Sequence, residues 1–416
     1  MSATDFSEAE GILHEMFQGF TKQLNDDLPP LYKMLKPNTD LVSGSKVKAS
    51  IQLERPQGLS SRSTSGLVLP TAVPGVYKEI EIETGRMYGV LEFDSKMLKL
   101  NSADARTRYI NYLENEMRGI KETLVEDIGR QIFGDGKGYL STAGTTSDSV
   151  TVQLATTALM HRFIVGMYVD IILTATGVAI TNGTARQISA VDITNKTITL
   201  SGSDKVTTDA THSVVRQGAY GAEMTGLGSI VSATADIYGI TTASYPRWQS
   251  YVKISVGAWS VKALVKAALE SRLRGGSYPN LVVSNGDLQG QYWYELTGSR
   301  TFDMASADAR KSKVEIMGVG YTALDVTIDG KTCKWISDRE CESGVLYGLD
   351  TDYLGLQHVG EPEFLQEKDG SILISNAPGG SGTDTFKAVL AYYPQMVCKR
   401  RNAQFKMTGI TAISGW

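Results

Sequence analysis

Hydrophobic side chains recur every three or four residues along one long stretch, residues 101–133. The recurring positions are Tyr109, Leu113, Met117, Ile120, Leu124, Ile128 and Ile132. This spacing places them on one face of an α-helix. Ser102 can cap the start, and Gly134 follows the last apolar position. The stretch therefore predicts a spine helix of about 45 Å. A coiled coil is the alternative, although the spacing does not hold a 3.5-residue repeat.

A second helical pattern lies near the N-terminus, at residues 7–24. Its apolar positions are Ile12, Leu13, Met16, Phe17, Phe20 and Leu24. Asn25 and the Pro29-Pro30 pair end this helix, and an irregular segment over 31–44 follows. Together they predict an arm whose apolar face packs on its own domain or on a neighbouring subunit.

Two strands with alternating apolar and polar residues follow, at 46–53 and 76–83. The residues between them are rich in Ser, Gly and Pro, so the pattern predicts a long hairpin with a tip of about twenty residues. This tip is either a solvated surface loop or an arm that reaches another subunit. Residues 86–93 form a third predicted strand, which leads towards the spine helix.

Residues 150–217 contain short β-branched runs separated by turn residues, with no helical period. They predict a small all-β module, either a barrel or a compact sandwich. Helical patterning resumes afterwards, which indicates that the module is inserted.

The remaining sequence mixes helices and strands, so the fold class is α+β. Helices are predicted at 257–273 and 287–296. A buried strand is predicted at 280–285, and a strand with turns at 344–357. Further strands are predicted at 313–319, 322–328, 331–336, 371–376, 385–393 and 395–411, with Asp329-Gly330 as a hairpin turn.

Composition narrows the classes of function. The chain has 416 residues, a net charge of −4 and no basic run, which argues against sequence-specific nucleic-acid binding. Three cysteines without a CxxC pair argue against a disulfide framework and favour a reducing compartment. The N-terminus lacks the apolar core of a secretory signal, and the most apolar window, 163–180, is interrupted by Asp170.

The sequence contains no catalytic constellation, and we expect no metal, no cofactor and no enzymatic activity. The glycines of 134–138 follow a helix, whereas a phosphate-binding loop opens one. His14-Glu15 lacks the second zinc ligand of an HExxH motif. The basic cluster Lys399-Arg400-Arg401 is either solvated or neutralises acidic groups across an interface. A hydrolase with an undetected site is the competing hypothesis, which a strongly perturbed carboxylate in a pocket would favour.

The order of these segments resembles a tailed-bacteriophage major capsid protein with the HK97-type fold. The resemblance rests on the arm, on the hairpin, and on RMYGVLEFDSKMLKL (86–100), which runs into the spine helix and its closing IFGDGKG. It continues through WSVKALVKAALESRL and NLVVSNGDL (259–288), DRECESGVLYGLDTDYLGL (338–356) and KRRNAQFKMTGI (399–410).

The resemblance implies a division of the chain into domains. These are an N-terminal arm (1–44), an extended hairpin loop (45–84), a peripheral domain with the spine helix (85–149), an inserted β-barrel-like domain (150–217), an axial domain (218–380) and a C-terminal return to the peripheral domain (381–416). Candidate intersubunit contacts are Phe17, Phe20, Arg55, Arg62, Arg400 and Arg401.

The resemblance also implies a function. Such a protein self-assembles through pentamers and hexamers into an icosahedral shell around viral double-stranded DNA, which it does not bind sequence-specifically. Partners would be other copies of itself and scaffolding, portal and decoration proteins, with assembly in the host cytoplasm and a final place in the virion capsid, without a membrane. The lysine–asparagine crosslink of some relatives has no matching positions here. Another structural virion protein and an encapsulin-like nanocompartment shell are the alternatives.

Overall fold

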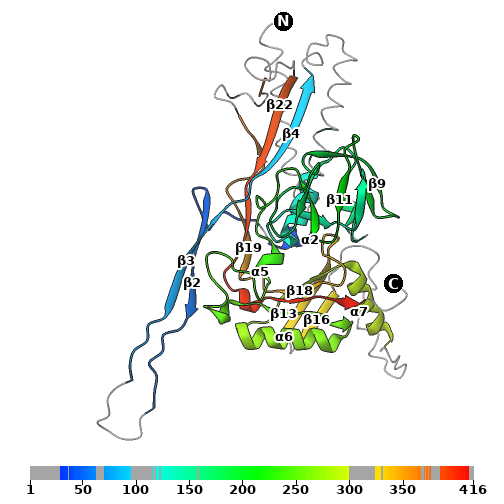
Figure 1. Cartoon of the computed structure of the whole chain (residues 1–416). Helices are drawn as coiled ribbons and strands as arrows, with labels where there is room; N and C mark the ends of the chain where they lie inside the picture. The colour runs from blue at the N-terminus through cyan, green and yellow to red at the C-terminus, as the bar shows by residue number, and fades with distance from the viewer. Residues whose placement is uncertain are drawn as a thin grey trace, which may run out of the picture.

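The structure is a computed structural model, and a long hairpin and a narrow sheet project from its body (Figure 1). It describes residues 29–35, 37–61, 70–94, 116, 119–120, 123–156, 159–298, 324–328, 331–366, 370, 372, 374–375 and 385–411. The predicted helix at 7–24, the strand at 313–319, the Asp329-Gly330 turn, Phe17, Phe20 and Arg62 lie outside these residues.

The projecting hairpin consists of β2 (Lys46–Glu54) and β3 (Val76–Glu83), which pair antiparallel from Lys46↔Glu83 to Glu54↔Val76. β1 (Val42–Ser43) adds a short third strand. The alternation predicted for both strands is confirmed. The buried positions near the root of the hairpin are Val47, Ala49, Ile51, Ile80 and Ile82, which pack with Ile240, Trp248 and Val397.

The segment before the hairpin is more regular than expected. The sequence predicts an irregular segment at 31–44, but the short helix α2 (Pro30–Leu35) includes the first five of these residues. Its Leu31, Tyr32 and Leu35 are buried, so packing stabilises a turn of helix that local spacing alone does not indicate.

The peripheral sheet joins segments that are distant in sequence. β4 (Met87–Asp94) pairs antiparallel along its whole length with β22 (Thr385–Tyr392). β20 (Glu363–Phe364) and β21 (Ile374–Ser375) complete the sheet. Its inner face contributes Met87, Leu91, Phe93, Ala388 and Leu390 to a large core that also contains Leu124, Ile128 and Ile132. Those three belong to the predicted spine helix, which is helical at 123–133 and at 116 and 119–120.

The axial sheet has six strands in the order β13-β24-β18-β15-β17-β16. Their bounds are β13 Tyr251–Lys253, β15 Leu281–Ser284, β16 Leu324–Ile328, β17 Lys331–Ser337, β18 Leu346–Leu349 and β24 Phe405–Met407. Helices α6 (Val261–Gly275) and α7 (Gly286–Gly298) agree with the two helices predicted in this region. Ser260 caps α6 by accepting from the Ala263 amide at 3.3 Å, and Gly276 ends it with a φ of +70°.

The two faces of the axial sheet belong to different cores. Val282, Leu346 and Phe405 pack with Leu264 of α6, whereas Leu281, Val283 and Tyr347 belong to the core that contains α2. Helices α6 and α2 therefore lie on opposite faces of this sheet.

The inserted module is a six-stranded barrel-like sheet in the order β5-β12-β8-β9-β10-β7, with a two-stranded sheet of β6 and β11. The bounds are β5 Tyr139–Thr142, β6 Thr146–Ser149, β7 Thr151–Gln153, β8 Tyr168–Leu173, β9 Arg186–Asp192, β10 Thr197–Leu200, β11 Val206–Thr208 and β12 His212–Arg216. Gly144 N donates to Gln153 O at 2.7 Å and Ala155 N to Thr142 O at 3.0 Å, which joins the two outer strands. β5 and β6 precede residue 150, the predicted start of the module.

Short elements connect these parts. They are η1 (Met160–Arg162), α5 (Leu227–Ile230), η2 (Pro246–Trp248), β14 (Gly257–Ala258) paired with β25 (Ile410–Thr411), β19 (Leu354–His358) paired with β23 (Pro394–Cys398), and η4 (Arg401–Ala403).

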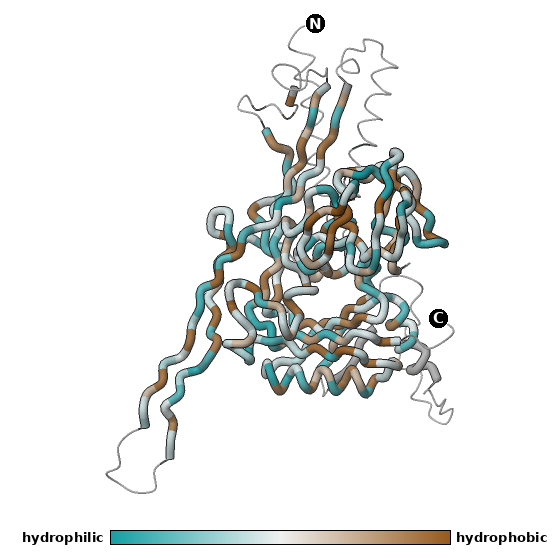
Figure 2. Tube along the Cα trace, viewed as in Figure 1, coloured by the Kyte–Doolittle hydropathy of each residue, from teal (hydrophilic) through white to brown (hydrophobic). Residues whose placement is uncertain are grey.

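Apolar and polar positions alternate along the projecting hairpin (Figure 2).

Candidate assembly surfaces

The distal half of the hairpin is a candidate contact surface. It extends beyond the body of the chain (Figure 1), and the exposed fractions are 99% for Leu59, 50% for Val73 and 66% for Tyr77. Gln57 and Val73 exchange backbone hydrogen bonds of 2.9 and 2.7 Å, so the two strands stay paired towards the tip. Arg55 is exposed in the same region. The hairpin therefore presents exposed apolar side chains and a cation beyond the core of its own subunit.

The outer face of the peripheral sheet is a second candidate surface. Tyr88, Val90 and Leu365 are 53%, 55% and 37% exposed. Val90 lies directly opposite Val389, and the Leu365 amide donates to the Val389 carbonyl at 2.9 Å. Val90 and Leu365 therefore lie on either side of Val389, on one face of the sheet. Contiguous exposed apolar side chains of this kind mark interaction surfaces more often than isolated ones do.

A largely buried cluster of charged residues joins four segments of the chain. We name it the junction cluster, and its members are Asp127 and Arg130 of the spine helix, His161, Arg162 and Arg216 of the inserted module, Glu223 of the following segment and Glu340 of the axial domain. Arg130 Nη2 lies 2.8 Å from Asp127 Oδ1, and Arg130 Nη1 donates to Glu223 Oε2 at 2.9 Å. Arg162 Nε lies 3.0 Å from Glu340 Oε2, and His161 Nε2 lies 2.8 Å from Glu340 Oε1.

The pKa values in the junction cluster reflect competition between burial and pairing. Burial acts to raise the pKa of Glu340, but the hydrogen bond from His161 and the charge of Arg162 outweigh it and hold the pKa below its usual value. For Glu223, burial dominates over the attraction of Arg130 and raises the pKa. The members pair mainly with one another, so the cluster links the inserted module to the spine helix and to the segment after β17.

The two arginines of the basic cluster have different environments. Arg400 is half-buried, donates from Nη1 to the Tyr353 hydroxyl at 3.0 Å and stacks over that ring. Arg401 is fully buried, and its guanidinium donates to four backbone carbonyls of its own chain. The prediction that Arg401 contacts another subunit is therefore wrong, because it organises the segment around α5 instead.

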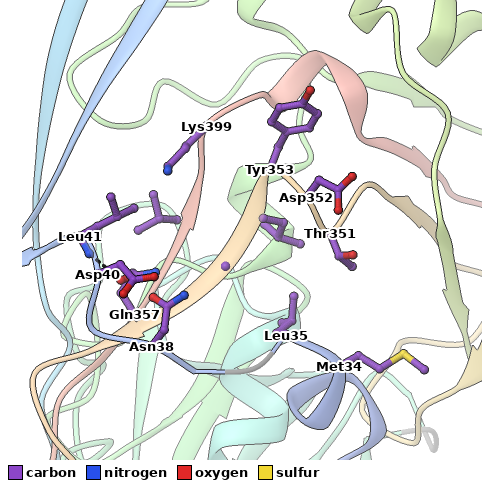
Figure 3. Close-up of a pocket in the computed structure, with 13 residues that line it drawn as sticks. Met34, Leu35, Asn38, Asp40, Leu41, Thr351, Asp352, Tyr353, Gln357 and Lys399 are labelled. Carbon is purple, nitrogen blue, oxygen red and sulfur yellow. Dashed lines mark hydrogen bonds between the residues drawn. The ribbon is translucent and has the colours of Figure 1, made fainter.

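A cavity of about 410 Å³ lies between the segment after α2 and the β19–β23 pair. In Figure 3, Asn38, Asp40, Gln357 and Lys399 surround this cavity. Gln357 Oε1 accepts from the Leu41 amide at 3.1 Å, which ties the segment to β19. The lining residues include no His or Cys, and they do not form a catalytic arrangement.

Other chemistry has no support among the described residues. No group of three or more His, Cys, Asp or Glu residues in that part of the chain is placed to hold a metal ion. Cys333, Cys341 and Cys398 are all buried free thiols. Among the same described residues, no helix is long and apolar enough to cross a membrane.

Asp338 follows β17 and forms a hydrogen bond with the Leu31 backbone of α2, and its titration is testable. It is 3% exposed, and burial raises its pKa to about 6, although hydrogen bonds from the Glu340 and Leu31 backbone oppose the rise. An unfolded Asp has a pKa of about 3.9. The folded state therefore binds the proton more tightly, and Asp338 contributes stability below about pH 4 that is lost as pH rises through about 6.

We expect Asp338→Asn to remove this pH-dependent contribution to the free energy of unfolding. The contribution changes by about 3 kcal/mol between about pH 4 and pH 6 in the wild type. Relative to wild type, the variant should gain stability as the pH is raised from about 4 to about 7. Urea unfolding at several pH values measures the difference, with the exposed Asp40→Asn as a control. A difference between variant and wild type that stays constant with pH would contradict the assignment.

The comparisons with known proteins identify the fold. The structure is similar to a capsid asymmetric unit of cyanophage A-1(L), with a TM-score of 0.51 and 11% sequence identity over 92% of this chain and 93% of that chain. The chain has the HK97-like capsid fold. No protein-family model matches the sequence, and no curated protein matches it significantly.

Two further solved structures share lower similarity. One is the capsid of an empty GTA particle, with a TM-score of 0.43 and 8% identity over 91% of this chain and 89% of that chain. Another is an encapsulin complex from Synechococcus elongatus, with a TM-score of 0.36 and 9% identity over 94% of this chain and 90% of that chain.

The outer face of the peripheral sheet includes exposed residues that are not among the candidate contacts predicted from the sequence. Tyr88 and Val90 alternate with the buried Met87 and Leu91 in β4, so the period-two pattern contained the signal for an outer face. Leu365 carried no such signal, because only the pairing of β20 with β22 brings it to the same face.

Proposed function

We propose that this protein is the major capsid protein of a tailed bacteriophage, which assembles through pentamers and hexamers into an icosahedral shell that encloses double-stranded DNA. The observation that carries the proposal is the HK97-like fold with a hairpin that projects far beyond its own body. A shell subunit needs extended surfaces that contact other copies, and heterologous contacts of this kind can close into rings.

The two apolar surfaces support this proposal because contact between them would bury apolar side chains of both. The distal hairpin carries Leu59, Val73 and Tyr77, and the outer face of the peripheral sheet carries Tyr88 and Val90. In the proposed shell, the hairpin of one subunit lies on the peripheral sheet of the next. Each contact can be weak, because many copies reinforce one another.

The proposal extends to the predicted domains and partners. Residues 45–84 act as the extended loop, 85–149 and 381–416 as the peripheral domain, 218–380 as the axial domain and 150–217, with β5 and β6, as the inserted domain. A separate scaffolding protein, a portal and decoration proteins would take part, with assembly in the host cytoplasm.

The mass distribution of the purified protein tests the proposed function. Light scattering and electron microscopy, with and without a scaffolding partner, should reveal closed shells or free pentamers and hexamers. A protein that remains a monomer or dimer in both conditions would refute the proposal. Shells that form but contain no DNA after production in infected cells would favour a nanocompartment.

Val90→Asp is expected to reduce shell yield about tenfold or more while the subunit remains folded, because a carboxylate would have to be desolvated under the docked hairpin. Shell yield is measured by sedimentation and folding by circular dichroism. Val178→Asp is the matched control, since Val178 is a 65% exposed valine on the inserted module. Equal shell yields from the two variants would argue against docking on this face.

A further inference from the structure

The outward face of α6 carries an unusual combination of exposed residues. Lys262, Lys266, Leu269 and Leu273 follow one another at helical spacing on this face. Leu273 is 80% exposed and Leu269 is 38% exposed, and both lysines are exposed. An isolated exposed leucine is ordinary, but two leucines one turn apart beside cations form a small amphipathic surface.

Two arginines flank this surface near the end of the helix. Arg272 stacks over Tyr278 with 4.7 Å between the guanidinium carbon and the ring centroid, and Arg274 stacks over Tyr251 at 5.0 Å. Glu270, which is half-buried, is the one acidic residue of α6. The face is therefore positive, in a chain whose net charge is −4.

The N-terminal segment of the same sequence has the complementary character. Residues 1–28 contain six acidic residues and one lysine. The helix predicted at 7–24 has an apolar face, and at 100° per residue Glu10 lies at one border of that face while Glu8 and Glu15 lie at the other. Such a helix could place apolar side chains on Leu269 and Leu273 and carboxylates near the flanking cations.

The arrangement of layers excludes docking within one chain. The described chain begins at Pro29, next to α2, and α2 lies across the axial sheet from α6. A helix on the outward face of α6 would be three packed layers from α2, about 30 Å at about 10 Å per layer. Residues 25–29 span at most about 17 Å, so a helix that ends at residue 24 cannot reach its own α6.

We propose that the outward face of α6 is the docking site for the acidic N-terminal segment of a neighbouring copy of this chain. The proposal rests on self-assembly, and it identifies a second intersubunit contact besides the hairpin. Burial of the two leucines supplies apolar contact, and the paired charges set the orientation and make the contact sensitive to salt.

Binding of a labelled synthetic peptide of residues 1–28 to the full-length protein tests the surface by fluorescence anisotropy, without any need for shells. We expect Leu273→Glu to weaken peptide binding about tenfold or more and added salt to weaken it further. Val178→Glu on the inserted module is the matched control and should bind as wild type does. A peptide that does not bind, or that binds equally to Leu273→Glu and wild type, would overturn the proposal.

Carbodiimide crosslinking identifies the copy that supplies the segment. Isotopically light and heavy proteins are mixed before assembly, and crosslinks between carboxylates of residues 5–27 and Lys262 or Lys266 are read by mass spectrometry. We expect mixed light–heavy crosslinks, and crosslinks confined to one isotope would overturn the proposal. Peptide binding by a protein that never forms oligomers would refute the proposed function but leave the docking surface in place.

Discussion

Replacement of Arg401 by methionine is expected to lower the free energy of unfolding by about 3–5 kcal/mol. The guanidinium donates from Nε to Ile230 O at 2.8 Å, from Nη1 to Ala235 O at 3.1 Å, and from Nη2 to Ser232 O at 2.9 Å and Ser229 O at 3.2 Å. Methionine retains much of the apolar volume but removes all four of these bonds. Ser229 O and Ala235 O then lose this donor, whereas Ile230 O and Ser232 O keep only bonds of 3.3 Å from Ser250. Urea unfolding followed by circular dichroism measures the loss.

The consequence should extend beyond one side chain. The four carbonyls belong to residues 229–235, and two of them, Ser229 O and Ala235 O, would have to find other donors. The guanidinium carbon also lies 5.6 Å from the ring centroid of Trp248, a residue of the core beneath the hairpin. Loss of Arg401 is therefore expected to loosen the root of the hairpin as well as the segment around α5.

Arg400→Met is the control for the preceding prediction. Arg400 precedes Arg401 in the sequence, but it is half-buried and stacks on Tyr353 near the surface. We expect its replacement to cost about 1 kcal/mol or less. If Arg401→Met were as stable as Arg400→Met, the carbonyl network would not be the stabilising element inferred here.

The contrast between these arginines shows what the sequence could predict. A Lys-Arg-Arg run is identified easily as basic, but nothing local distinguishes an interface cation from one that satisfies buried carbonyls. The distinction depends on residues 229–235, which lie about 170 positions away in sequence. Periodicity, by contrast, is a local property, and it correctly predicted β2, β3 and α6, while a short apolar run predicted the buried strand β15.

The inserted module also combines features that local sequence predicts with features that depend on distant residues. Its β character followed from β-branched runs, but its first strand was assigned to the preceding segment. β5 belongs to the module because it pairs with β12, whose residues lie about seventy positions later. The junction cluster was also missed, since its members come from four separate segments and each looks like an ordinary surface charge in sequence. The outer face of β4 was recoverable from alternation alone, although Leu365 was not.

Deletion of the hairpin tip, residues 57–74, is expected to leave the subunit folded and to abolish closed shells. Leu59 and Val73 are exposed, and the core beneath the hairpin uses residues nearer its root, so the free energy of unfolding should change by less than about 0.5 kcal/mol. Assembly should fail because each subunit loses the part of the hairpin that reaches beyond its own body. Thermal unfolding measures the first effect, and electron microscopy of assembly reactions measures the second.

The geometry of the hairpin makes this deletion feasible. A Cβ built on Gly75 would lie 3.1 Å from Pro56 Cδ, so the two ends left by the deletion are already neighbours and a short turn can join them. A full-length variant with Leu59→Ser and Val73→Ser keeps the length of the hairpin and removes only its exposed apolar side chains. If apolar contact drives docking, this variant should assemble as poorly as the deletion. Normal shells from the deletion would show that the tip is a solvated loop, and the distal hairpin would then no longer be an intersubunit arm.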